Sequence, residues 1–122
     1  MDSREIISQR EASLLELALE SWRFQRLFGR ALAKLDPLEA ARFTNQHRYF
    51  VGKIESCLAD AGMRFVSHEG QIFETGTAAT PLNIDDFEAE DVVVVVETIE
   101  PTVMNTSGLV RMGSVMLRKV NS

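Results

Sequence analysis

The sequence lacks the features that would tie it to a membrane or to an oxidising compartment. It has a single cysteine, Cys57, among 122 residues, so no internal disulfide can form. That usage is typical of a reducing compartment, and we expect a cytoplasmic protein. The longest apolar runs are far shorter than the roughly 20 residues that a membrane helix needs. The mixed charges of residues 1–5 do not fit a signal peptide, and we expect no membrane association.

Basic residues are scarce in the second half of the chain. Residues 65–122 carry three basic and nine acidic side chains, a formal charge of −6, whereas residues 1–64 carry ten basic and nine acidic ones, a charge of +1. An acidic segment without interleaved basic and aromatic residues does not attract nucleic acid. The charge pattern therefore predicts a protein partner with a basic surface and no nucleic acid.

Combinations of residues that carry out catalysis are also missing. The sequence has no phosphate-binding loop and no metal-ligand spacing. His47 and Cys57 are ten positions apart on one predicted helix, about three turns, so they cannot form a nucleophile–base pair. The acidic run 85–91 lacks the alternation and central glycine of a calcium loop, and we interpret it as a solvated loop. We expect no enzymatic activity, no metal and no cofactor.

Apolar residues recur at spacings of three and four over the first half, which predicts helix. The pattern breaks at Leu35-Asp36-Pro37, where Asp36 can cap a new helix and Pro37 suits its first turn. The second helix is predicted to run to about Asp60, and Gly62 is placed to end it. Residues 1–62 are therefore predicted to form a helical hairpin that serves as a dimerisation module.

The apolar face of this hairpin is wider than a two-stranded seam, so a hairpin alone would leave part of it exposed. Pairing two hairpins into a four-helix bundle would cover it, and we expect a homodimer. The residues predicted to lie in the dimer interface are Leu14, Leu17, Trp22, Phe24, Phe28, Phe43, Phe50 and Ile54.

The second half is predicted to be a small all-β head over residues 63–122. Five consecutive valines, Val92–Val96, favour a strand buried on both faces. Residues 63–66 and 71–73 flank a turn that ends in glycine and are interpreted as a hairpin. A turn at Glu100-Pro101 and short strands after Gly108 complete a predicted compact barrel or sandwich. The fold class is thus α+β.

This order of elements, with three sequence motifs, resembles GrpE, the family of nucleotide exchange factors of Hsp70 chaperones. Residues 61–65 resemble the family's glycine-containing link between helices and head. Residues 73–75, Phe-Glu-Thr, stand where the family has a Phe-Asp-Pro element. Residues 110–115, Val-Arg-Met-Gly-Ser-Val, resemble its late Leu-Arg-Pro-Ala-x-Val signature. The resemblance covers about residues 40–120.

The resemblance implies a co-chaperone that binds the nucleotide-binding domain of an Hsp70-type ATPase through its β head and promotes ADP release. Arg111 matches the signature arginine, which in the family faces the chaperone. Val103, Met104 and Asn105 lie in the neighbouring connection and are expected to bind the partner too.

The sequence departs from the family in three places. The family's His-Glu-Ala element is missing near residues 78–81, and Met112-Gly113 replaces Pro-Ala. The chain begins close to the predicted bundle, so we expect the long paired stalk to be absent or nearly so. These departures favour an alternative, a GrpE-fold dimeric adaptor or assembly protein without exchange activity.

Two readings from other classes are weaker. The glycine-spaced strands after Gly108 resemble those of lipoyl- or biotin-carrier domains. Such domains need a lysine at an exposed hairpin tip, and the only lysine of the β half, Lys119, is near the chain end within a predicted strand. An enzyme has no supporting nucleophile, base or ligand set.

Overall fold

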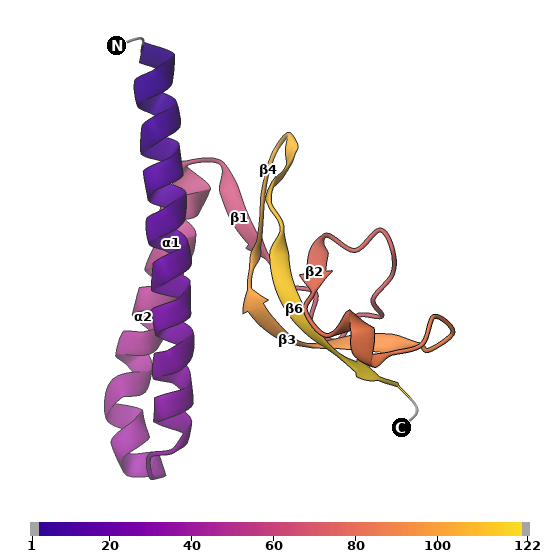
Figure 1. Cartoon of the computed structure of the whole chain (residues 1–122). Helices are drawn as coiled ribbons and strands as arrows, with labels where there is room; N and C mark the ends of the chain where they lie inside the picture. The colour runs from indigo at the N-terminus through magenta and orange to yellow at the C-terminus, as the bar shows by residue number, and fades with distance from the viewer. Residues whose placement is uncertain (1–2, 121–122) are drawn as a thin grey trace. The chain divides into compact units, whose positions relative to one another are not determined.

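The computed structural model describes residues 3–120, and over this range the protein is α+β (Figure 1). A pair of long helices comes first and two small sheets follow. The chain divides into two compact parts, a helical unit that ends at Gly62 and a β unit that begins at Met63. Within the described residues, no helix has the length and apolar character needed to cross a membrane.

The helical unit consists of α1 (Ser3–Ala33) and α2 (Pro37–Asp60). The predicted break between them is confirmed. The Asp36 carboxylate accepts hydrogen bonds from the backbone N–H groups of Leu38 and Glu39, each at 3.0 Å, and Pro37 follows as the first helical residue. These bonds satisfy two of the donors that a helix start leaves open. Gly62 has a φ of 76°, the left-handed conformation that ends a helix.

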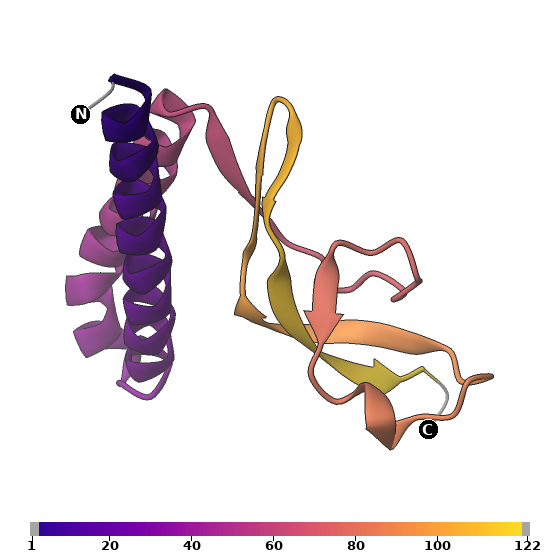
Figure 2. The ribbon, with the colours of Figure 1, turned by 45° about the horizontal axis from the view of Figure 1, so that its top comes forward.

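The β unit contains two three-stranded sheets (Figure 2). In the first sheet all neighbours are antiparallel, in the order β1 (Met63–Val66), β4 (Thr102–Asn105) and β5 (Gly108–Arg111). In the second sheet the order is β2 (Ala79–Pro81), β6 (Gly113–Lys119) and β3 (Val93–Glu100). Strand β6 is parallel to β2 and antiparallel to β3. A short 3₁₀ helix, η1 (Ile84–Asp86), follows β2.

One long bent hairpin joins the two sheets. Strand β3 continues into β4 across Pro101, and β5 continues into β6 across Met112, so both arms pass from one sheet to the other together. Glu100 and Pro101 therefore form a bend, and the chain does not reverse there as the predicted turn would require. A Cβ on Gly113 would lie 2.4 Å from the Glu100 carbonyl oxygen and 2.6 Å from the Thr102 nitrogen. Only glycine fits where the two arms cross this corner.

The predicted hairpin between residues 63–66 and 71–73 is wrong. Strand β1 pairs with β4, about 40 residues further along the chain. Residues 71–73 instead run beside β3: Phe73 N donates to Val93 O, and Val95 N donates to Gln71 O, both at 2.9 Å. The local turn signal was real, but a local signal does not identify the partner of a strand.

The valine run forms β3, yet it is not buried on both faces as expected. Val93 and Val95 are buried, whereas Val92 and Val96 are 52% and 44% exposed. The pairing with β6 shifts register between Val95 and Glu97, so Val96 is the extra residue of a bulge. The core of this sheet is Ala79, Val93, Val95, Val115 and Leu117, with Phe73 and Phe87 packed against it.

Candidate functional site

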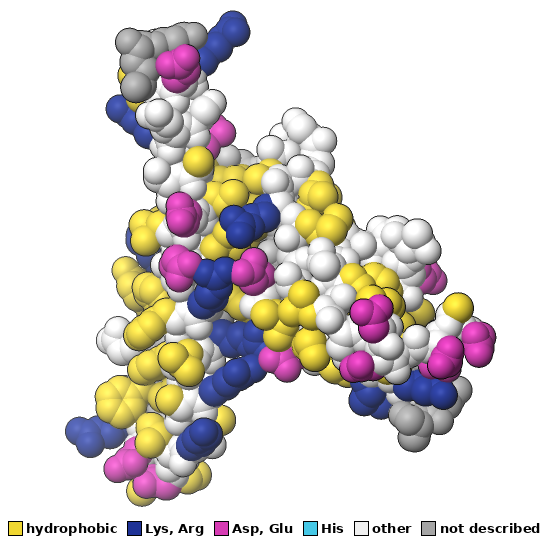
Figure 3. Space-filling model, in the orientation of Figure 1, with side chains coloured by type: hydrophobic (Ala, Val, Ile, Leu, Met, Phe, Trp, Pro, Cys, Tyr) yellow, Lys and Arg dark blue, Asp and Glu magenta, His cyan; other side chains and the backbone are white. Residues whose placement is uncertain are grey.

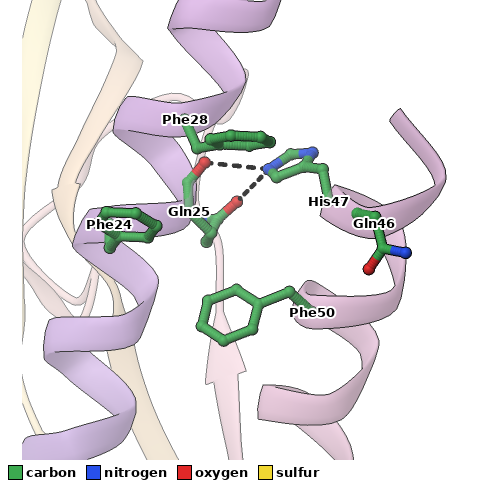
Figure 4. A pocket seen from close by; sticks show the side chains of 6 residues that line it. All are labelled: Phe24, Gln25, Phe28, Gln46, His47 and Phe50. Atoms are coloured by element: carbon green, nitrogen blue, oxygen red, sulfur yellow. Dashed lines mark hydrogen bonds between the residues drawn. The ribbon is translucent and has the colours of Figure 1, made fainter. Parts of the chain in front are cut away.

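The helical unit presents an apolar face with two hollows along the seam between α1 and α2. The first has a volume of about 150 Å³ and is lined by Phe24, Gln25, Phe28, Gln46, His47 and Phe50 (Figure 4). The second, of about 190 Å³, is lined by Leu14, Leu17, Ala18, Ser21, Phe50, Lys53, Ile54 and Cys57. Phe50 lines both hollows. We call this surface the hairpin face.

His47 holds the two helices together within the hairpin face. Its Nε2–H donates a hydrogen bond shared between the backbone oxygen and the side-chain oxygen of Gln25, each 3.0 Å away (Figure 4). The Phe28 ring lies 5.7 Å from the imidazole, and a Cβ on Gly29 would come within 3.3 Å of it. His47 is therefore an interhelical packing residue, and its Nε2 is already engaged.

Most residues predicted for the dimer interface do lie on the hairpin face. Leu17 and Phe24 are 66% and 62% exposed, and Phe50 is also exposed. Phe43 is exposed on α2 but lines neither hollow. Leu14 and Phe28 are half-buried on the hollow walls. Burying such side chains is worth about 1.5–3 kcal/mol each. The face therefore favours a covered state.

Two of the predicted interface residues have other surroundings. Ile54 is buried in the hairpin itself, where it also lines the second hollow. Trp22 lines neither hollow, and the Arg26 guanidinium lies 5.4 Å from the centre of its ring, a cation–π contact. Sequence reasoning missed the polar lining residues Gln25, Gln46 and Lys53. An apolar periodicity does not register polar side chains that flank it.

In the β unit, the predicted partner-binding residues have unequal access to solvent. Arg111, at the end of β5, is 47% exposed in its side chain and pairs with Glu100 at 3.7 Å. Met104 and Asn105 are half-buried in β4, and the Asn105 carboxamide oxygen accepts a hydrogen bond from Ser107 N in the adjoining turn. Val103 is fully buried. Its side chain is part of the protein interior in this conformation, so of the predicted partner-binding residues it is the least accessible.

The bend at Pro101 places Glu100 near the end of β5, where its carboxylate pairs with Arg111. A partly exposed ion pair of 3.7 Å contributes about 0–1 kcal/mol. Arg111 can therefore exchange Glu100 for a carboxylate of a partner at little cost.

A third surface lies in the acidic segment that the sequence predicted to be a solvated loop. A hollow of about 530 Å³ is lined by Phe73, Glu74, Thr75, Ile84, Asp85, Phe87, Glu88, Ala89, Asp91 and Val93. We call it the acidic hollow. Figure 3 shows acidic side chains gathered beside hydrophobic ones on the β unit. Within residues 3–120, no group of three or more His, Cys, Asp or Glu side chains is arranged to hold a metal ion.

No protein-family model matches the chain, and no match was found among the curated proteins or the solved structures.

Proposed function

We propose that the protein is a homodimeric, GrpE-like co-chaperone whose β unit binds an Hsp70-type ATPase and promotes ADP release. The observation that carries the proposal is the combination of an uncovered apolar hairpin face with a β unit that follows it directly after Gly62. The first feature supports assembly of two chains. The second supplies a hydrogen-bonded β platform for a protein partner.

The hairpin face supports the homodimer through its chemistry. Its exposed Leu17, Phe24 and Phe50 form a surface that is richer in large apolar groups than a solvated helix pair needs. A second copy presents the same face, so a two-fold axis would bring apolar side chains of both chains together. The result would be a four-helix bundle with the hollows filled by side chains of the partner.

In the β unit, Arg111 is the residue best placed to contact the ATPase. Its side chain is half exposed at the end of β5, and its ion pair with Glu100 is a weak one at 3.7 Å. Met104 and Asn105, in the neighbouring strand, extend that surface with one apolar and one polar side chain. Arginine favours carboxylate partners because its planar group bonds two oxygens at once.

Exchange of this kind needs no covalent chemistry. A factor that binds the open form of a two-lobed ATPase more tightly than the closed form weakens nucleotide binding by the same free energy. A tenfold weakening corresponds to about 1.4 kcal/mol of differential binding. A few contacts around Arg111 are sufficient to supply that difference.

The test is the release rate of a fluorescent ADP analogue from a purified Hsp70 protein. We expect the protein to accelerate release and Arg111→Ala to lose at least about tenfold of that acceleration, as removal of a charge-assisted contact predicts. Arg118→Ala is the matched control, because Arg118 is an exposed arginine of β6 and not one of the residues assigned to this surface. Equal release with and without the protein would refute exchange activity.

The alternative, a dimeric adaptor of the same fold without exchange activity, has its own support. Arg111 is paired with Glu100, Val103 is buried, and the His-Glu-Ala element of the family is missing. An adaptor predicts binding to an Hsp70 or another protein with no change in nucleotide release. Calorimetric titration into Hsp70, with and without ADP, separates the two: exchange activity requires weaker binding when ADP is present, and an adaptor does not.

A further inference from the structure

We propose that the acidic hollow binds a lysine- and arginine-rich peptide segment of a protein partner, with one large apolar side chain of that segment seated on its phenylalanine floor. The site is distinct from the Arg111 surface and does not depend on exchange activity. Four observations support it, concerning the floor, the charges, the rigidity and the size of the hollow.

The floor of the acidic hollow is apolar and firmly anchored. Phe73 and Phe87 pack against the core of the second sheet, while part of each ring remains exposed to the hollow. Val93 lies beneath them in β3, and Ile84 contributes an exposed aliphatic side chain from η1. An aromatic or aliphatic side chain placed on this floor would remove apolar area from water on both sides.

The charges of the lining residues all have one sign. Glu74, Asp85, Glu88 and Asp91 line the hollow, and the lining residues that the structure describes include no lysine or arginine. Lys119 lies at the edge, where its Nζ is 3.3 Å from a carboxylate oxygen of Asp91. The Lys119 amine thus already forms an ion pair with one carboxylate of the hollow, Asp91. A basic segment would meet complementary charge here, as the −6 charge of residues 65–122 predicts on a coarser scale.

Asp91 retains its negative charge over a wide pH range. The hydrogen bond from the Glu88 backbone N–H, at 2.8 Å, holds the pKa of the Asp91 carboxyl below its ordinary value, and Lys119 acts in the same direction. A second hydrogen bond, from Asp91 N to Glu88 O, joins the same two residues, and together the two bonds close the turn 88–91.

The loops that carry the remaining carboxylates are held in place by hydrogen bonds as well. Glu74 N donates to the Thr77 hydroxyl, and Thr77 N donates to Glu74 O. On the other side, the Asn83 carboxamide makes two hydrogen bonds of 2.9 Å to the Leu117 backbone and fixes the start of η1 on β6. A preformed site loses little conformational entropy on binding.

The size of the hollow fits a peptide side chain with its flanking backbone. Its volume of about 530 Å³ lies within the roughly 300–1,000 Å³ typical of binding pockets. An apolar floor with charged groups at the rim selects a segment that alternates a large apolar residue with cations. The sequence alone also predicted a basic protein partner, but it did not show where on the protein that partner would bind.

The test is a titration of the full chain with an acetylated Lys-Arg-Phe-Arg-Lys peptide, followed by amide chemical shifts at about 0.15 M ionic strength. We expect the shifts to concentrate at Phe73, Phe87 and Val93, with saturation below about 1 mM peptide. The double variant Asp85→Asn/Glu88→Gln should raise the dissociation constant about three- to tenfold, because two exposed charge pairs are lost. A Lys-Arg-Ala-Arg-Lys peptide should bind at least about threefold more weakly for lack of the ring.

The matched control is Asp86→Asn/Glu90→Gln. It removes the same charge from the same segment, but neither residue lines the hollow, so the dissociation constant should change less than about twofold in view of salt screening. The proposal is overturned by equal weakening in both double variants, which would indicate a diffuse charge effect. It is also overturned if the alanine peptide binds as well as the phenylalanine peptide, or if no shifts occur up to about 1 mM.

Discussion

At the scale of single residues, the bend at Pro101 in the β unit leaves no space for a side chain at Gly113. Gly113 lies where β6 crosses the bend between β3 and β4, and its N–H donates to the Thr102 hydroxyl at 3.1 Å. That hydroxyl donates in turn to the Ala78 carbonyl, and Thr102 is almost completely buried. The side chain of Thr102 thus links β4, β6 and the residue before β2.

Replacing Gly113 with alanine should destabilise the β unit by about 1–3 kcal/mol, the usual cost of overpacking. The new methyl group would meet three backbone atoms closer than 3 Å, and backbone cannot move aside as a flexible side chain can. Hydrogen exchange of the backbone amides in β3 and β6, measured at increasing urea concentration, gives the free energy of unfolding of the β unit. Gly76→Ala is the control, because an added Cβ there meets nothing within 4 Å. Equal stability of the two variants would contradict the packing at the corner.

At the scale of elements, helix ends follow local chemistry and strand pairing does not. Asp36, Pro37 and Gly62 determine where α2 begins and ends, and each acts on backbone groups within a few residues. The partner of β1 is instead β4, and residues 71–73 pair with β3. These pairings depend on which strands the bent hairpin brings near, so a turn signal between two candidate strands was insufficient.

Asp36→Ala should lower the stability of the helical unit by about 0.5–2 kcal/mol, because two backbone donors at the start of α2 lose their acceptor. Asp36→Asn should retain most of the stability, since its side-chain oxygen can still accept those bonds. Urea unfolding followed by far-ultraviolet circular dichroism is the measurement. Losses of the same size in both variants would point to charge, not capping, as the contribution of Asp36.

At the scale of the whole molecule, the hairpin face concerns assembly. Two helices bury only the seam between them, and here Leu58 is buried while Leu17 and Phe24 remain mostly exposed. The Phe24 and Phe28 rings stack with their centres 6.5 Å apart, so the exposed ring continues into the wall of the first hollow. A second copy can extend this packing, whereas the single chain has no further helix to do so among its described residues.

Phe24→Glu should convert the proposed dimer to a monomer. A two-fold interface contains the residue twice, so loss of about 1.5–3 kcal/mol per ring raises the dissociation constant by a factor on the order of 100 or more. Phe24→Leu keeps an apolar side chain at the same position and should remain dimeric. Sedimentation equilibrium gives the molecular mass directly. A monomeric wild-type protein at about 100 μM would rule out the proposed assembly, since a weaker association is not a stable one.

The location of the acidic hollow could not be predicted from the sequence. Its floor combines Phe73, which precedes β2, with Phe87 and Val93, which follow η1, and its rim draws on both segments. Each residue was visible as a loop or strand residue, and the acidic run looked like an ordinary solvated stretch. The two rings pack against the same core and line the same hollow only after the sheet has formed.

By itself, the sequence determined the helical hairpin, its break at Asp36-Pro37, its end at Gly62 and the change to β structure after it. Those features arise from interactions between residues a few positions apart, which periodicity and capping chemistry describe directly. Only the tertiary structure decided that Val96 is exposed, that Val103 is buried and that Glu100 pairs with Arg111. These outcomes depend on the bulge in β3 and the bend at Pro101, because both set side-chain direction through contacts between strands that are distant in sequence.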